Sequence, residues 1–242
     1  MPNPVRRLAL ALALCAAVPA ATLHAGTDID LGAIGQPAFA TFAEEIGVAT
    51  AYNPVSPAEP LGTLGFDIGV SATLVDIDNG VWNQAVAGAD APSSLVIPRI
   101  QARKGLPFGI DVGVSYISVP SSNVAVWGGE LRKAILEGGA ATPAVAVLAH
   151  YSALSGVDDL DLTSYGVDLG ISKGVLFLTP YAGAGMLWYS ADPKVGGLTK
   201  VDDSAARGYV GVRITPFPVL NLVAQADLGP VTGYTLRVNL GF

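Results

Sequence analysis

The chain has 242 residues, of which 51% are hydrophobic and 14% are charged, and its formal net charge is −7. The acidic balance argues against nucleic acid as a partner. Beyond residue 25 no apolar run reaches the roughly 20 residues that a membrane-spanning helix needs. The apolar residues of this region must therefore alternate with small or polar ones.

The first 25 residues have the three parts of a secretory signal peptide. Arg6 and Arg7 form a basic start, an apolar run follows, and small residues precede a cleavage site after Ala25, with Ala20 as the alternative. The run is too short for the rival interpretation as a membrane-spanning helix. We expect residues 1–25 to be removed during export.

Removal of the signal peptide changes the chemistry of the chain. Cys15 lies within it and follows Leu14, which is not the small residue of a lipoprotein signal. Loss of Arg6 and Arg7 leaves 11 basic side chains against 20 acidic ones, a net charge of −9. The mature chain then has no cysteine for a disulfide or a metal site, and His150 is its only histidine.

Residues 26–45 form an N-terminal segment that contains one short helix. Pro37 suits a first helical position and Gly47 suits a C-terminal cap. Phe39, Phe42 and Ile46 fall on one helical face. We predict a helix at about 37–45, followed by strands from residue 46 onward.

From residue 46 to the end, apolar residues alternate with small or polar ones at a period of two, which is typical of β-strands. Turn residues separate the alternating segments. We find eleven predicted strands, at 46–52, 66–74, 96–103, 108–116, 127–135, 145–152, 164–172, 177–190, 207–214, 220–227 and 232–242. Short turns are expected at one end, including 55–62, and longer loops at the other, at 76–93, 153–160 and 190–204.

The last predicted strand carries the most specific signal in the chain. Its apolar side ends in an aromatic residue and consists of Tyr234, Leu236, Val238, Leu240 and Phe242. This pattern resembles the closing strand of bacterial outer-membrane β-barrels, in which it is the assembly signal read by the barrel-assembly machinery. The resemblance implies location in the outer membrane, among outer-membrane lipid and lipopolysaccharide.

The fold class predicted from these patterns is all-β, a closed antiparallel transmembrane β-barrel of 10–12 strands that occupies residues 46–242. Bacterial barrels favour even numbers, so eleven segments favour twelve strands. The alternative, a secreted β-sandwich or lipocalin-like barrel, would have a richly charged exterior. Aromatic residues near strand ends are expected as interfacial girdles, namely Tyr52, Phe66, Phe108, Tyr116, Trp127, Tyr151, Trp188, Tyr189, Tyr234 and Phe242.

Charged residues gather on the opposite, inward side of the predicted strands. They are Asp67, Arg99, Arg103, Asp111, Glu130, Arg132, Asp168, Arg213, Asp227 and Arg237. These side chains either form a solid core of salt bridges or line a water-filled, selective lumen. A water-filled lumen predicts a porin-like passive channel or uptake barrel for an unknown small solute. A solid core of salt bridges predicts a structural or anchoring barrel without an open pore.

The helix at 37–45 is similar in position to the N-terminal helices of outer-membrane fatty-acid and hydrocarbon channels. This likeness implies a plug inside the lumen. A periplasmic lead-in to the first strand is the alternative.

One pattern resembles an enzyme. His150-Tyr-Ser152 is similar to the His-x-Ser of outer-membrane lipid A 3-O-deacylases, which implies His150 as base and Ser152 as nucleophile. That family has Asn after the serine, where this chain has Ala153, and no Glu follows to complete the triad. We expect no enzyme activity, no catalytic residues, and no metal or cofactor.

Overall fold

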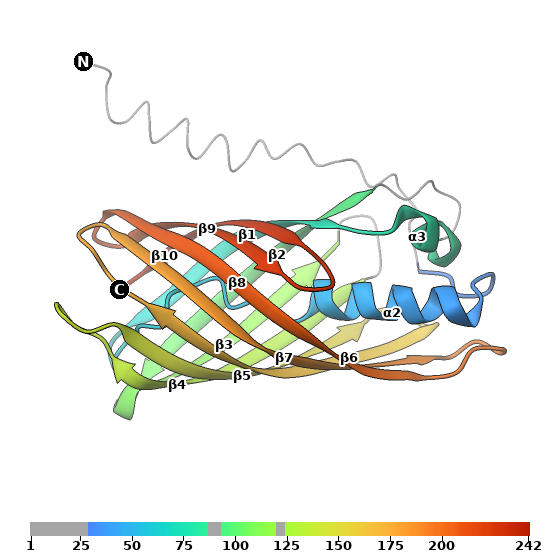
Figure 1. Cartoon of the computed structure of the whole chain (residues 1–242), viewed down its shortest axis with the longest axis horizontal. Helices are drawn as coiled ribbons and strands as arrows, with labels where there is room; N and C mark the ends of the chain where they lie inside the picture. Colours follow the sequence, from blue (N-terminus) through green and yellow to red (C-terminus); the bar gives the residue numbers. More distant parts are fainter. Residues whose placement is uncertain (1–28, 87–92, 120–123) are drawn as a thin grey trace, which may run out of the picture.

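The computed structural model describes residues 29–86, 93–119 and 124–242, which form a closed barrel of ten antiparallel strands (Figure 1). Each strand pairs with its neighbours in sequence, and β1 pairs with β10 to close the barrel. The strands are β1 Phe66–Asp76, β2 Ser94–Leu106, β3 Ile110–Ser118, β4 Ala125–Glu137, β5 Ala144–Ser155, β6 Leu160–Ser172, β7 Leu178–Pro193, β8 Val201–Phe217, β9 Leu220–Leu228 and β10 Gly233–Gly241.

The predicted fold class is confirmed, with ten strands. The preference for twelve was wrong because the segment predicted as the first strand, 46–52, is the end of a helix and the start of an extended segment. The other ten predicted segments correspond to the ten strands. The predicted signal peptide lies outside the described residues.

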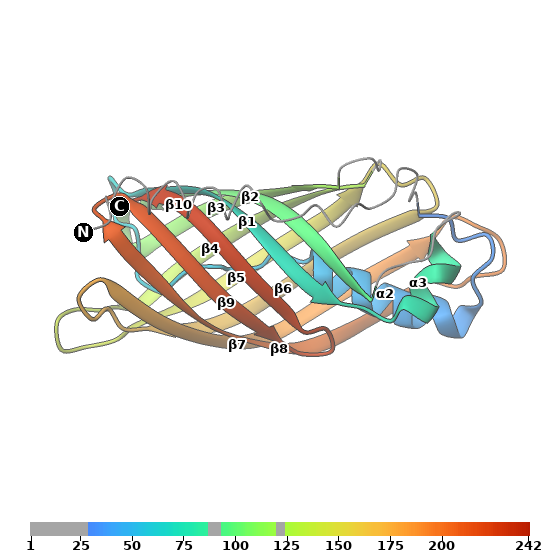
Figure 2. The same ribbon diagram turned by 90° about the horizontal axis from the view of Figure 1, so that it is seen from above.

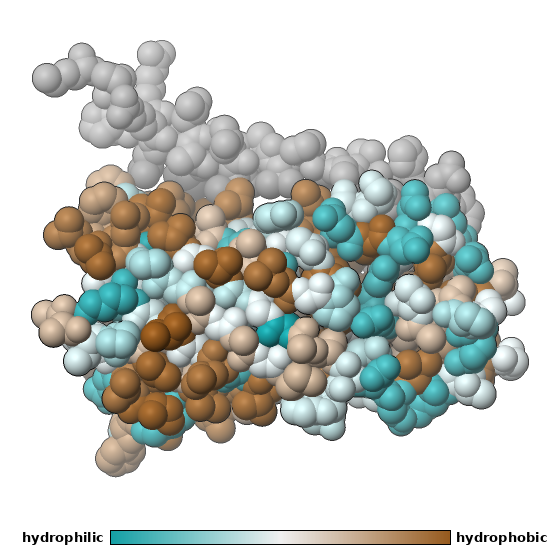
Figure 3. All heavy atoms as spheres, viewed as in Figure 1, coloured by the Kyte–Doolittle hydropathy of each residue, from teal (hydrophilic) through white to brown (hydrophobic). Residues whose placement is uncertain are grey.

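The alternation predicted from the sequence sorts the side chains between two environments. In β1, Asp67, Ser71 and Thr73 are buried inside the barrel, whereas Ile68 and Val70 are more than half exposed on its exterior. Figure 3 shows hydrophobic residues gathered over the half of the visible surface that holds the C-terminus. An apolar exterior of this extent requires a lipid environment.

Aromatic residues pair at both ends of the apolar exterior. Tyr116 and Trp127 lie with ring centroids 4.4 Å apart at one end, and Phe66 and Phe242 lie 4.9 Å apart at the other. These positions are typical of interfacial girdles. The prediction was wrong for Tyr52 and Tyr189, because both rings are buried inside the barrel.

The two ends of the barrel differ, and we name them the helix end and the Phe242 end. The helix end holds the longest connection, 77–93, with the short helix α3 (Asn79–Ala85), whose first turn is capped by the Asp78 carboxylate. The Phe242 end holds the connection at 107–109, a single 3-10 turn, and the two-residue connection at 218–219. The loops predicted at 153–160 and 190–204 are present but shorter, at 156–159 and 194–200, because the flanking strands β5, β6, β7 and β8 extend into them.

The N-terminal helix α2 (Gln36–Thr50) lies inside the barrel at the helix end (Figures 1 and 2). Pro37 lies in its first turn, and Phe39, Phe42 and Ile46 are buried as their helical spacing predicts. The helix continues to Thr50, since Ile46 and Gly47 pack inward one turn beyond Phe42. The helix therefore lies where a plug would lie.

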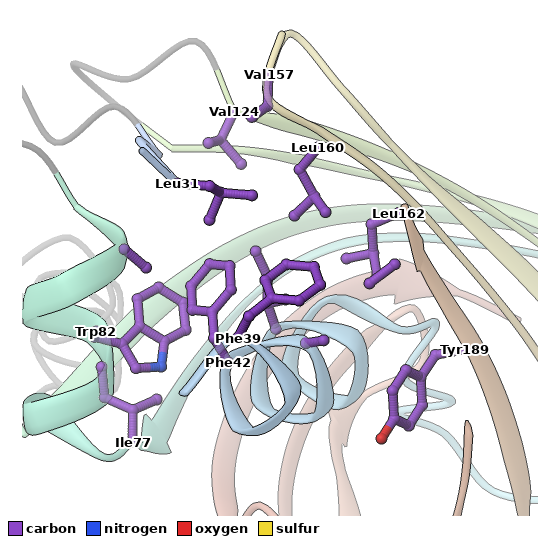
Figure 4. Packing of buried hydrophobic residues seen from close by; sticks show 14 of the residues in the cluster. Leu31, Phe39, Phe42, Ile77, Trp82, Val124, Val157, Leu160, Leu162 and Tyr189 are labelled. Atoms are coloured by element: carbon purple, nitrogen blue, oxygen red, sulfur yellow. The ribbon is translucent and has the colours of Figure 1, made fainter. Parts of the chain in front are cut away.

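At the helix end, the interior of the barrel is an apolar core built around α2 (Figure 4). Phe42 and Trp82 of α3 pack edge to face with centroids 4.9 Å apart, and the Trp82 Nε1 donates a 2.6 Å hydrogen bond to Glu45. Leu31 from the segment before α2, Leu160 of β6 and other buried residues complete the cluster. Within the described residues no helix has the length and hydropathy to cross a membrane.

Candidate functional site: the occupied lumen

An extended segment continues from α2 toward the start of β1, as Figure 1 shows. It runs through the part of the interior between α2 and the Phe242 end, which we call the lower lumen. We call residues 51–61 the luminal strap, and α2 together with the strap the plug (residues 36–61). Tyr52, Val55 and Ala58 of the strap are buried. Pro54, Pro57 and Pro60 remove backbone N–H donors, which disfavours both helix and strand here.

Cationic and amide side chains of the barrel wall hold the strap by its backbone carbonyls. Arg99 donates to the carbonyl of Ala51 at 2.8 Å, and Arg207 donates to that of Tyr52 at the same distance. The remaining donors to strap carbonyls are Gln101 to Asn53, Arg237 to Val55 and Arg132 to Pro57, at 2.9, 3.1 and 2.6 Å. Five wall side chains from the four strands β2, β4, β8 and β10 thus fix the strap along its length.

Nearer the Phe242 end, the strap also donates hydrogen bonds to the wall. The Ala58 N–H donates to Ser172 Oγ at 3.1 Å, and the Leu61 N–H donates to Asp111 Oδ1 at 3.1 Å. Glu59 forms a 2.8 Å ion pair with Arg213. Since these contacts come from β3, β6 and β8, the strap is fastened to opposite sides of the wall.

The side chain of Asn53 joins the strap to an amide and carboxylate network on β9. Its Nδ2 donates to Asp227 Oδ2 at 2.9 Å, and its Oδ1 accepts from Gln225 Nε2 at 2.7 Å. Thr235 donates to the same carboxylate oxygen at 3.2 Å. The donors to Asp227 are all neutral groups.

Ion pairs within and between strands balance most of the buried charge between α2 and the Phe242 end. Asp67 lies between Arg103, at 3.2 Å, and Arg237, and it also accepts from Asn239 at 2.8 Å. Glu130 lies 3.4 Å from Arg132 and 3.7 Å from Arg103. Networks of this kind compensate for the cost of desolvating each charge.

His150 lies beside a carboxylate, which is one requirement of the enzyme-like reading. Asp168 Oδ2 lies 3.4 Å from His150 Nε2, but Arg207 contacts the same nitrogen at 2.7 Å and pairs with Asp168. His150 Nδ1 and Ser152 Oγ are both buried and have no hydrogen-bond partner, so the two do not bond to each other. A serine without a base cannot be activated as the lipid A deacylase pattern requires.

The ten charged residues predicted to face the lumen all lie inside the barrel, but they are buried to different degrees. Eight are buried, and Arg213 and Asp227 are partly buried. Seven of the ten join ion pairs with side chains, whereas Arg99, Asp111 and Asp227 have no ion pair among the described residues. The strap residues, together with Gln101, Ser172 and Gln225, were missed, since neutral side chains carried no signal in the charge pattern.

The lower lumen is filled but polar. Cavities of about 50 and 10 Å³ remain beside the plug. Several buried polar atoms have no hydrogen-bond partner, among them Arg99 Nη1, Ser71 Oγ and Asn239 Oδ1. Such groups need water or a ligand to avoid a cost of about 1–3 kcal/mol each.

The rim at the helix end is charged and open to solvent. The Nζ of Lys194, in the connection between β7 and β8, lies 2.8 Å from a carboxylate oxygen of Asp161 and 2.8 Å from one of Asp192. Hydrogen bonds to these carboxylates raise the pKa of Lys194 above its ordinary value. Lys194 therefore stays charged at neutral pH.

The closed barrel, with an apolar exterior and a polar lower interior, defines a membrane-spanning β-barrel of the bacterial outer-membrane class. No family model matches the chain, and no curated protein sequence matches it.

Solved outer-membrane barrels are similar to the chain, with low TM-scores and low sequence identity. They include the KdgM porin (TM-score 0.40, 10% identity, 73% of this chain and 99% of that chain) and Omp33 of Acinetobacter baumannii (0.34, 10%, 74% and 100%). The Ralstonia pickettii toluene transporter TbuX has a TM-score of 0.26 and 10% identity, over 88% of this chain and 98% of that one.

Proposed function

We propose that the protein is a gated uptake barrel of a bacterial outer membrane, in which the plug must move before small polar or ionic solutes can cross. The observation that carries this proposal is the way the wall holds the strap. Arg99, Arg132, Arg207 and Arg237 each donate to a backbone carbonyl of the strap. Water can replace each such contact, because the net free energy of a hydrogen bond to a charged group is only about 1.5–3 kcal/mol.

The charged wall also sets the class of solute. If the strap leaves, Asp67, Arg103, Glu130 and Arg237 line a polar passage. Fixed charges of both signs raise the local concentration of ionic solutes and disfavour hydrophobic cargo. We therefore expect small hydrophilic solutes.

A structural barrel without a pore is the second candidate, and one observation favours it. Phe39, Phe42 and Ile46 of α2 are at most 2% exposed and belong to the apolar core at the helix end. Displacement of the whole helix would expose these side chains to water at about 1.5–3 kcal/mol each. A permanent plug would serve an anchoring role.

Planar-bilayer recordings distinguish the two candidates. The mature chain should show intermittent conductance, and a variant that lacks residues 36–61 should conduct continuously. Opening of the deletion variant alone, with no conductance from the intact chain, would favour the structural candidate. A variant that lacks residues 139–142, in the exposed connection between β4 and β5, is the deletion control and should behave as the intact chain does.

A further inference from the structure

We propose that the larger cavity, beside the C-terminal end of α2, binds a small zwitterion of the α-amino acid type. Its carboxylate would contact Arg99 and its ammonium group would contact Asp227. The cavity lies where the helix passes into the strap, and the walls around it come from β1, β2, β8, β9 and β10. This inference goes beyond the proposed uptake function, since binding requires no movement of the plug.

Arg99 supplies an unused hydrogen-bond donor at this cavity. Its side chain is buried, and its Nη2 donates to the Ala51 carbonyl at 2.8 Å. Its Nη1 is buried without a partner, and no carboxylate lies within ion-pair distance among the described residues. A buried guanidinium with a free N–H favours a carboxylate ligand.

Asp227 lines the same cavity, and so does Arg207, which pairs with Asp168. The Asp227 oxygens accept hydrogen bonds from the neutral groups of Asn53, Gln225 and Thr235, and no ion pair reaches Asp227 within the described residues. A simple anion bound at Arg99 would face this carboxylate. A zwitterion would place its ammonium group there and so balance both charges.

The size of the cavity restricts the ligand. Its volume of about 50 Å³ corresponds to room for roughly three to five waters. This space suits glycine or alanine better than an amino acid with a long side chain. Gly233 keeps the space open, because a Cβ there would lie 3.3 Å from Thr73 Cγ2 and 3.4 Å from Asp227 Oδ2.

The cavity lies beside a low part of the barrel rim. Pairing between β8 and β9 ends at Gly208 and Leu228, so residues 201–207 of β8 rise above β9 without a partner on that side. Gly208, Leu228 and Val231 all line the cavity. A solute can therefore approach from the helix end.

Isothermal titration of the purified barrel with alanine, propionate and ethylamine tests this site. Propionate lacks the ammonium group and ethylamine lacks the carboxylate. Alanine should bind saturably and at least tenfold more tightly than either. Arg99→Met and Asp227→Asn should each weaken alanine binding at least tenfold, whereas Lys200→Met and Asp202→Asn, an exposed ion pair on the rim, should not.

Gly233→Val is a second variant that changes no charge, and it should abolish binding by filling the cavity. Heat-modifiable migration on gels establishes that each variant has folded. Equal binding of alanine and propionate, with stronger alanine binding in Asp227→Asn, would overturn the proposal in favour of an anion site. Absence of saturable alanine binding to the folded parent would also overturn it, and neither result would bear on whether the plug moves.

Discussion

Arg132 of β4 donates a 2.6 Å hydrogen bond from its Nη1 to the backbone carbonyl of Pro57, and its Nη2 donates to Ser56 Oγ at 3.0 Å. The same guanidinium lies 3.4 Å from Glu130. One wall side chain therefore holds both the strap and a buried carboxylate. Arg132 therefore links the plug directly to the barrel.

Replacement of Arg132 should loosen the plug. Arg132→Met removes both donors to the strap and one of the two cations beside Glu130. We expect the free energy of unfolding in urea and detergent to fall by about 3 kcal/mol, because a buried charge loses a partner. Lys200→Met, which removes an exposed ion pair of the rim, should change it by less than about 1 kcal/mol. Equal effects of the two substitutions would contradict the role assigned to Arg132.

Gly47 is the position at which α2 packs on the wall. A Cβ there would lie 3.0 Å from Cγ of the buried Tyr189 ring. Gly47→Val should therefore displace the helix and raise both conductance and protease cleavage of residues 36–61. Gly196→Val is the matched control, since nothing lies within 4 Å of a Cβ at Gly196. Unchanged protease protection of the plug in Gly47→Val would show that the Tyr189 side chain moves and the helix stays in place.

Phe242 has two roles that mutation can separate. Its ring packs against Phe66, and its backbone N–H donates to the Phe66 carbonyl at 3.1 Å. Phe242→Ala and Phe66→Ala remove the same ring contact, but only the first alters the predicted assembly signal. We expect Phe242→Ala to lower the amount of heat-modifiable barrel in outer-membrane fractions several-fold more than Phe66→Ala. Equal losses would reduce Phe242 to a packing residue.

The pair His150 and Ser152 should be dispensable for any acyl-chain release. Neither His150 Nδ1 nor Ser152 Oγ has a hydrogen-bond partner, and Arg207 occupies the other side of the imidazole. Ser152→Ala should leave host lipid A acylation unchanged in mass spectra. So should His150→Ala, once gels establish that the variant has assembled. Loss of 3-linked acyl release in assembled Ser152→Ala would restore the enzyme reading.

The strands could be predicted from the sequence because the barrel separates lipid from the interior at every second residue. Segments such as 66–74 and 108–116 alternate without interruption, and they correspond to β1 and β3. Residues 46–52 also alternate, yet they leave the sheet. Ile46 packs one helical turn after Phe42 in the apolar core, and this burial outweighs a short local pattern.

The charges of the candidate site could be predicted, but their partners could not. Arg99, Arg132 and Arg237 fall on the inward side by periodicity alone. That they bind backbone carbonyls of one strap depends on where residues 51–61 run, and a carbonyl has no side-chain signature. The prolines of this segment indicated a turn at 55–62, although they equally suit a chain that makes few backbone hydrogen bonds.

A reversible tether between strap and wall is the most direct test of the gate. The Ala58 N–H donates to Ser172 Oγ at 3.1 Å, so cysteines at both positions, in a mature chain that we expect to have none, are placed to form a disulfide. Planar-bilayer recordings of Ala58→Cys/Ser172→Cys should show no conductance when the variant is oxidised. Intermittent conductance should return after reduction, at the level of the parent chain. Equal conductance in both states, or none in the reduced variant and the parent, would contradict a gate formed by this plug.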